Sequence, residues 1–258
     1  MKLSKPLELT GTLLFAIIFC APVALFGQQS AAAQTTNNSI EPVALETLQR
    51  MSDLLKNATK ITFTAETIRD QPATTGQMLE FFYTSHVSMV RPNLLRFDIQ
   101  GDIWNASIWY DGKKITLMDP RTTFYAQADG PATIDETVMF LVEKFQAPLP
   151  MAMLLISDIA KKATEGLKTG FEAGVVMVNG IKCHQLAFTE DDADWQLWVE
   201  DGPNPLPRRL SVTYKKIEGS PHVSISFSDW NLDAVIPANT FVFHMPDGAT
   251  KVDVKPVK

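Results

Sequence analysis

Two kinds of hydrophobic spacing divide the chain into helical and extended segments. Ala44, Leu48, Met51 and Leu55 recur at helical spacing and predict an amphipathic helix that begins near Pro42. From Ile61 the apolar positions alternate with polar ones, which is the period of a strand. This alternation predicts strands at about 61–66, 78–90, 95–100, 103–110, 115–117 and 123–128. The connections are short, so we expect an antiparallel meander of about six strands.

The middle of the chain returns to helical spacing before a second run of strands. Thr133 and Glu136 form a capping-box pattern at the start of an apolar stripe that extends to Phe145. A second helix is expected from Met151 to about Glu165. The alternation then predicts strands at about 175–178, 181–188, 195–200, 208–215 and 222–230, with Asn179-Gly180 as a two-residue hairpin turn. Helices between two runs of strands are typical of a lid over a sheet.

The N-terminal segment has the pattern of a secretory signal. Lys2 and Lys5 precede an apolar run, and Ala31-Ala32-Ala33 offers a cleavage site. We therefore expect a signal peptide at 1–33 and a single domain at 34–258. A retained membrane anchor is the alternative, although Glu8 and Pro22 interrupt the apolar run.

The charge argues against one class of partner, and the cysteine content argues against a disulfide. The formal net charge is −6, and removal of residues 1–33 would change it to −7. An acidic chain argues against a nucleic-acid partner. Residues 34–258 contain a single cysteine, Cys183, so no internal disulfide is expected in the processed chain.

No familiar catalytic or metal-binding motif is present. The patterns of zinc proteases, serine hydrolases and phosphate-binding loops are all missing from the sequence. Cys183 and His184 are adjacent on a predicted strand, so they should point to opposite faces and not share a ligand. The acidic run 190–194 lacks the EF-hand spacing and is expected to be a solvated turn. We therefore predict no metal, no cofactor and no catalytic residue.

Large aromatic side chains on the predicted strands are the most informative feature. Several fall on faces that simple alternation would expose to solvent. They could line an apolar cavity for a hydrophobic ligand, or they could pack under covering helices, and both arrangements give the same pattern. The candidate cavity residues are Phe63, Phe81, Phe82, Phe97, Trp104, Trp109 and Trp198.

Six segments resemble a known family. They are YDGKKITLMDP, GPATIDETV, APLPMAMLL, HQLAF, DADWQLWVEDGPNPLPRRLSVTYK and SDWNL. Together they are similar to predicted periplasmic proteins with domain of unknown function 2092, whose fold resembles that of the LolA and LppX lipoprotein carriers. The resemblance implies an α+β fold, a strongly curved, half-open antiparallel β-barrel closed by helices, with a helical lid near 131–165. It assigns no enzymatic activity and no functional residue.

Three functional hypotheses follow. The first is a non-enzymatic periplasmic binding or carrier protein for a hydrophobic small molecule, a lipid or the acyl chains of a lipoprotein. The second is a protein-binding envelope sensor on the same scaffold, with a transient protein partner. The third is an unrecognised hydrolase built around His184 or His86.

Overall fold

A computed structural model describes residues 39–145 and 150–253. The chain divides into two units, residues 1–36 and 37–258, and the described residues all belong to the second. The predicted signal peptide at 1–33 lies outside the described residues. Within the described ranges, no helix has the length and hydropathy that a membrane span requires.

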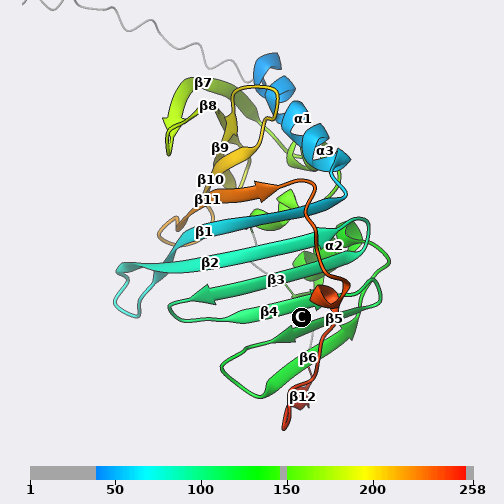
Figure 1. The fold of residues 1–258 in the computed structure, drawn as a ribbon. Helices are drawn as coiled ribbons and strands as arrows, with labels where there is room; N and C mark the ends of the chain where they lie inside the picture. The colour runs from blue at the N-terminus through cyan, green and yellow to red at the C-terminus, as the bar shows by residue number, and fades with distance from the viewer. Residues whose placement is uncertain (1–38, 146–149, 254–258) are drawn as a thin grey trace, which may run out of the picture. The chain divides into compact units, whose positions relative to one another are not determined.

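The order of elements agrees with the predicted order of helix, strands, helices and strands (Figure 1). The first run consists of α1 (Pro42–Asn57), β1 (Lys60–Pro72), β2 (Met78–Val90), β3 (Leu94–Gly101), β4 (Ala106–Tyr110), β5 (Lys114–Met118) and β6 (Phe124–Asp129). The middle consists of α2 (Ile134–Phe145), the 3-10 helix η1 (Pro150–Leu154) and α3 (Ile159–Ala163). The second run consists of β7 (Thr169–Val178), β8 (Ile181–Thr189), β9 (Ala193–Glu200), β10 (Pro207–Tyr214) and β11 (His222–Asn231). The 3-10 helix η2 (Ala238–Phe241) and β12 (Thr250–Val252) follow.

The strands form one curved, open sheet. Its order is β12-β6-β5-β4-β3-β2-β1-β11-β10-β9-β8-β7, and the described pairs are antiparallel except for β12 with β6. β1 joins the two runs because it pairs with β2 on one side and with β11 on the other. The predicted closure into a barrel is not found among the described residues, since β12 and β7 lie at opposite ends of the order.

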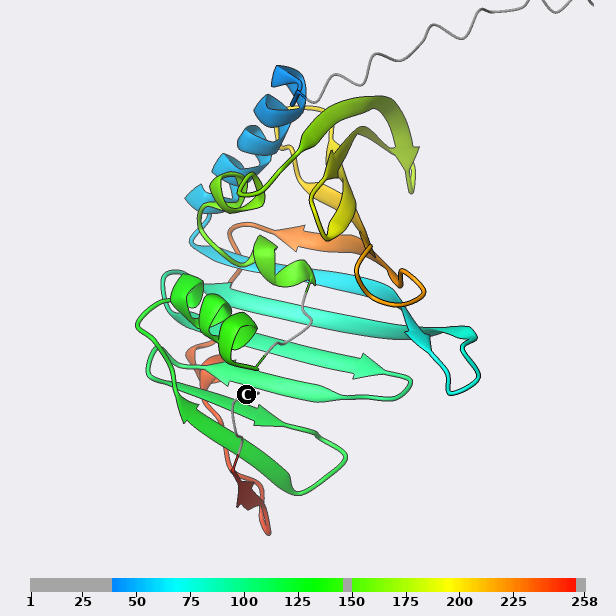
Figure 2. The ribbon, with the colours of Figure 1, turned by 180° about the vertical axis from the view of Figure 1, so that it is seen from behind.

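One face of the sheet is covered by helices, as Figure 2 shows for α2, η1 and α3. We call this the inner face. Its core includes Val87, Phe97 and Ile225 from the sheet and Ile134 and Leu155 from the helical segment. α1 packs against α3 and against β7, β8 and β9. The other face, which we call the open face, is crossed over β3 to β6 by the C-terminal segment (Figure 1).

Local sequence signals account for several element ends. Thr133 Oγ1 accepts a hydrogen bond from Glu136 N at 3.2 Å, which confirms the predicted capping box. Asn179 and Gly180 both have positive φ, at 49° and 80°, as a type I′ hairpin turn requires. The single helix predicted for 151–165 is wrong. It is divided into η1 and α3, because Asp158 caps a new helix by accepting a hydrogen bond from Lys161 N.

The predicted strand at 103–110 is also too long at its start. β4 begins only at Ala106, and residues 102–105 form a loop. Asn105 Oδ1 accepts a hydrogen bond from Gly101 N at 2.8 Å, so a side chain occupies the backbone donor that a continued strand would use. Trp104 therefore lies on a loop.

Candidate functional site

The inner face holds two of the predicted cavity residues in its packed core. Phe63 and Phe97 are only 2% and 3% exposed. The Phe63 ring stacks on Trp230 with 4.3 Å between ring centroids and meets Phe227 edge-on at 6.1 Å. Aromatic pairs of this geometry stabilise a core beyond their buried area. These two side chains are therefore packed mainly against protein.

Partly exposed apolar side chains continue this face at its margin. Phe81 and Tyr83 on β2 share the inner face with buried Val87, because their positions differ by even numbers. Val212 and Tyr214 on β10 are half-buried and pack against the same core. We call Phe81, Tyr83, Val212 and Tyr214 the inner margin.

The phenol groups of the inner margin are partly withdrawn from water. Burial raises the pKa of Tyr83 and of Tyr214, and the positive charge of Arg69 opposes both shifts. The same arginine therefore acts on both phenols. The margin thus combines apolar ring surface with two hydroxyl groups and one nearby cation.

Polar contacts of Arg91, which we call the Arg91 latch, join the helical segment to the sheet. Arg91, in the turn between β2 and β3, donates hydrogen bonds to Leu155 O at 3.0 Å and to Ile156 O at 3.2 Å. It also contacts Ser157 Oγ at 3.2 Å, and Asp135 of α2 accepts hydrogen bonds from Ser157 N. Burial lowers the pKa of the guanidinium, and the nearby Asp135 raises it. One buried cation thus joins the sheet, α2 and the segment after η1.

The remaining predicted residues lie elsewhere. Phe82 and Trp109 are on the open face, and Trp104 is on the loop 102–105. Trp109 lies under the Arg96 guanidinium at 3.6 Å and meets Phe243 of the C-terminal segment at 5.0 Å. Trp198 is also on the open face, 5.2 Å from the Arg209 guanidinium. The seven candidates are thus divided between two faces and a loop and do not line one cavity.

The inner margin also contains residues that sequence reasoning missed. Tyr83, Val212 and Tyr214 were not among the candidates. Tyr83 was detectable in principle, because it lies four residues before the apolar Val87 on the same predicted strand. Tyr214 could be identified only from the pairing of β10 with β11, because that pairing places β10 near the first run of strands.

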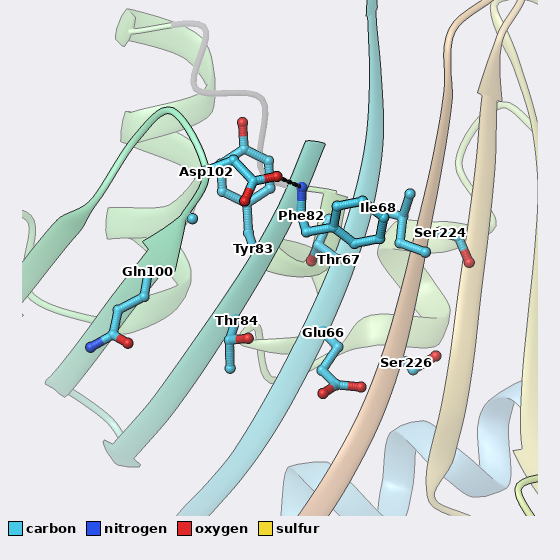
Figure 3. Close-up of a pocket in the computed structure, with 11 residues that line it drawn as sticks. Glu66, Thr67, Ile68, Phe82, Tyr83, Thr84, Gln100, Asp102, Ser224 and Ser226 are labelled. Atoms are coloured by element: carbon cyan, nitrogen blue, oxygen red, sulfur yellow. Dashed lines mark hydrogen bonds between the residues drawn. The ribbon is translucent and has the colours of Figure 1, made fainter. Parts of the chain in front are cut away.

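A pocket of about 420 Å³ lies on the sheet where β1, β2, β3 and β11 meet (Figure 3). Phe82 lines it together with Ile68, and the lower part is polar, with Glu66, Thr84 and Gln100. No other predicted cavity residue belongs to its lining. The lining residues are Glu66, Thr67, Ile68, Phe82, Tyr83, Thr84, Gln100, Gly101, Asp102, Ser224 and Ser226.

The histidine proposed for a hydrolase is engaged by two carboxylates. His184 Nδ1 lies 2.8 Å from Glu172 Oε1, and Nε2 lies 3.2 Å from Asp201 Oδ1. The hydrogen bond to Glu172 is the main cause that raises the pKa of His184, and the bond to Asp201 adds to it. Both ring nitrogens are therefore directed at acids and neither at a nucleophile, which a catalytic base requires.

The neighbouring thiol has the character of a core residue. Cys183 is fully buried, and burial raises the pKa of its thiol, which disfavours the reactive thiolate.

In the acidic run 190–194, Asp191 pairs with Lys168 and Asp194 pairs with Lys215. Among residues 39–145 and 150–253, no three potential ligands are grouped as a metal site.

Solved structures with a similar course of the chain come from several bacteria. An uncharacterised conserved protein from Thermus thermophilus is 11% identical, with a TM-score of 0.49 and coverage of 82% of this chain and 99% of that one. Mycobacterium tuberculosis lipoprotein LppX is 11% identical, with a TM-score of 0.46 and coverage of 76% and 100%. A LolA superfamily protein from Nitrosomonas europaea is 10% identical, with a TM-score of 0.37 and coverage of 78% and 97%.

All three TM-scores lie below 0.5, so these likenesses say nothing specific about a ligand of this chain. A search of curated proteins found no match. One family matches residues 44–255, which is most of the chain, and its description is "Predicted periplasmic protein (DUF2092)". The chain belongs to this family of predicted periplasmic proteins.

Proposed function

We propose that the protein is a non-enzymatic periplasmic binding or carrier protein whose ligand is a lipid or the acyl chains of a lipoprotein. The observation that carries the proposal is the inner margin, where the apolar inner face continues past its packed core to half-buried side chains. Apolar burial contributes about 25 cal/mol per Å² without specific polar contacts, so an acyl ligand needs no catalytic motif. The proposed ligand site comprises Phe81, Tyr83, Val212 and Tyr214, and it borders the packed core that contains Phe63 and Phe97.

The helical segment supports the same proposal. α2, η1 and α3 cover the inner face, and the Arg91 latch holds the segment after η1 by a few polar contacts. The same segment also packs apolar side chains, among them Ile134 and Leu155, into the core of that face. Opening of this cover would expose more of the apolar inner face to an acyl chain. We also propose export by the segment 1–33, in keeping with the family description.

A pair of adjacent residues gives a matched test. Tyr83 belongs to the inner margin, and Phe82 points to the other face. Binding of a fluorescent fatty acid in solution should weaken at least about tenfold in Tyr83→Ser and change little in Phe82→Ser. Thermal unfolding of both variants would show that each remains folded under the assay conditions.

Native mass spectrometry of protein purified from a bacterial periplasm provides an independent measurement. We expect a co-purifying lipid mass that decreases in Tyr83→Ser. Absence of any lipid together with absence of fatty-acid binding would refute the proposal. Specific recovery of an envelope protein under those conditions would favour the sensor hypothesis instead.

A further inference from the structure

Five large apolar side chains lie exposed at one end of the sheet. We call them the apolar rim: Ile68, Phe82, Ile103, Trp104 and Ile217. They are between 38% and 52% exposed, so each leaves much of its surface in water. They belong to the β1–β2 hairpin, the β3–β4 loop and the β10–β11 loop, whose ends lie on the same side of the sheet in both views (Figures 1 and 2).

Hydrogen bonds and side-chain contacts join these three connections. Phe82 N donates to Asp102 Oδ2 at 2.9 Å, and Asp102 N donates to Phe82 O at 3.1 Å. The β3–β4 loop is thus bonded to the hairpin beside Ile103. Ile68 and Phe82 are cross-strand partners and lie side by side in Figure 3. Gly219 of the β10–β11 loop lies against the Met78 side chain, which places Ile217 near the same hairpin.

The rim differs from a site that encloses a small ligand. Ile68 and Phe82 lie on β1 and β2 and line the neighbouring pocket, whereas Ile103, Trp104 and Ile217 lie on loops and do not line it. Exposed apolar surface gathered in this way is typical of an interaction site. Trp104 adds an indole, whose apolar body and polar N–H favour the boundary between lipid and water.

Charges of both signs accompany the apolar side chains. Lys216 precedes Ile217 and Glu218 follows it, while Glu80 lies two residues before Phe82 on the same face of β2. Mixed charges match a zwitterionic headgroup, which carries both a phosphate and an ammonium. The overall charge of −6 opposes strong attraction to an anionic surface.

We propose that the apolar rim docks the protein on the surface of a zwitterionic phospholipid bilayer. The rim inserts Trp104 and its apolar neighbours at the level of the headgroups, with the adjacent charges in the headgroup layer. This function goes beyond the carriage proposed above, because it needs no ligand on the inner face. A carrier with both sites could exchange lipid with a membrane without a protein partner.

Trp104 provides a direct readout on the full chain. All five tryptophans are in the described ranges, and Trp104 is the exposed one, whereas Trp109, Trp195, Trp198 and Trp230 are half-buried. Vesicles of phosphatidylcholine and phosphatidylethanolamine with bromine near the headgroups should quench the protein's fluorescence. Trp104→Phe keeps the apolar surface, so we expect it to bind these vesicles but to lose most of the quenching.

Co-flotation with unbrominated vesicles of the same composition measures affinity. The double variant Ile103→Ser/Trp104→Ser should bind at least about tenfold more weakly. The matched control is Val235→Ser, which removes a 98% exposed apolar side chain outside the rim. It should bind like the unchanged chain.

Three outcomes would overturn the proposal. They are absence of vesicle binding, binding without quenching of Trp104, and equal loss of binding in the rim variant and in Val235→Ser. Binding without Trp104 quenching would assign the contact to another segment of the chain. Since the fatty-acid assay uses Tyr83→Ser and no vesicles, failure of docking remains distinguishable from failure of the carrier function.

Discussion

Replacing Arg91 with alanine tests how the helical cover is held. The side chain is only 9% exposed, and its guanidinium donates to Leu155 O and Ile156 O and contacts Ser157 Oγ. Asp135 lies 3.7 Å away. Alanine removes all of these contacts and leaves two backbone carbonyls without their charged donor. Side-chain truncation also leaves a void behind the cover.

The structure sets the size of the effect. A hydrogen bond to a charged group contributes about 1.5–3 kcal/mol, and bonds from one guanidinium are not additive. Asp135 is 41% exposed, so water can solvate it after the change and limits the loss. We therefore expect Arg91→Ala to lower the free energy of unfolding by about 3 kcal/mol. That is a large part of the roughly 5–15 kcal/mol typical of a domain.

Two measurements check this prediction. Urea denaturation followed by circular dichroism gives the free energy of unfolding. Hydrogen exchange of the 150–158 backbone reports opening of the cover without global unfolding. Arg91→Lys should show an intermediate loss, because one ammonium cannot reproduce the paired donors of a guanidinium.

Arg121 provides the control for this change. It pairs with Asp119 at 2.9 Å, but its side chain is 48% exposed, so Arg121→Ala should change stability by no more than about 0.5 kcal/mol. If Arg91→Ala altered unfolding and 150–158 exchange no more than Arg121→Ala does, the latch would have no energetic role.

Two further predictions concern pH and packing. The hydrogen bond to Glu172, and then the one to Asp201, raises the pKa of His184 in the folded state. Protonated His184 should therefore contribute its full stabilisation below the ordinary histidine pKa of about 6.5. This stabilisation should disappear as the pH rises through the raised pKa of the folded state. The stability difference between the unchanged chain and His184→Gln should therefore shrink in urea titrations as the pH rises above about 6.5. A difference that stays constant with pH would contradict this prediction. Gly170→Val should destabilise the fold by about 2 kcal/mol in the same assay, because a Cβ on Gly170 would lie 2.6 Å from the Phe188 ring. The exposed hairpin position Thr75→Val is the control, and an equal effect there would contradict the packing argument.

Local pattern was sufficient for most elements because it reflects interactions between near neighbours. The helical stripe from Ala44 to Leu55, the capping box at Thr133 and the turn at Asn179-Gly180 all depend on residues a few positions apart. The same pattern failed at Trp104, where Asn105 hydrogen-bonds the backbone and delays β4. Local competition of this kind is not visible in hydrophobic periodicity.

The sequence by itself therefore determined the order of elements, the alternation along each strand and membership of a family of predicted periplasmic proteins. Tertiary structure decided which face each aromatic residue occupies. Alternation separates Phe82 from Tyr83, but only the pairing of β1 with β11 and the helical cover decide which of them borders the core. The same long-range pairing brings the β10–β11 loop, with Ile217, beside the β1–β2 hairpin of the apolar rim. The physical reason is that burial depends on contacts between segments more than 100 residues apart, as for β1 and β11, which neighbouring residues do not specify.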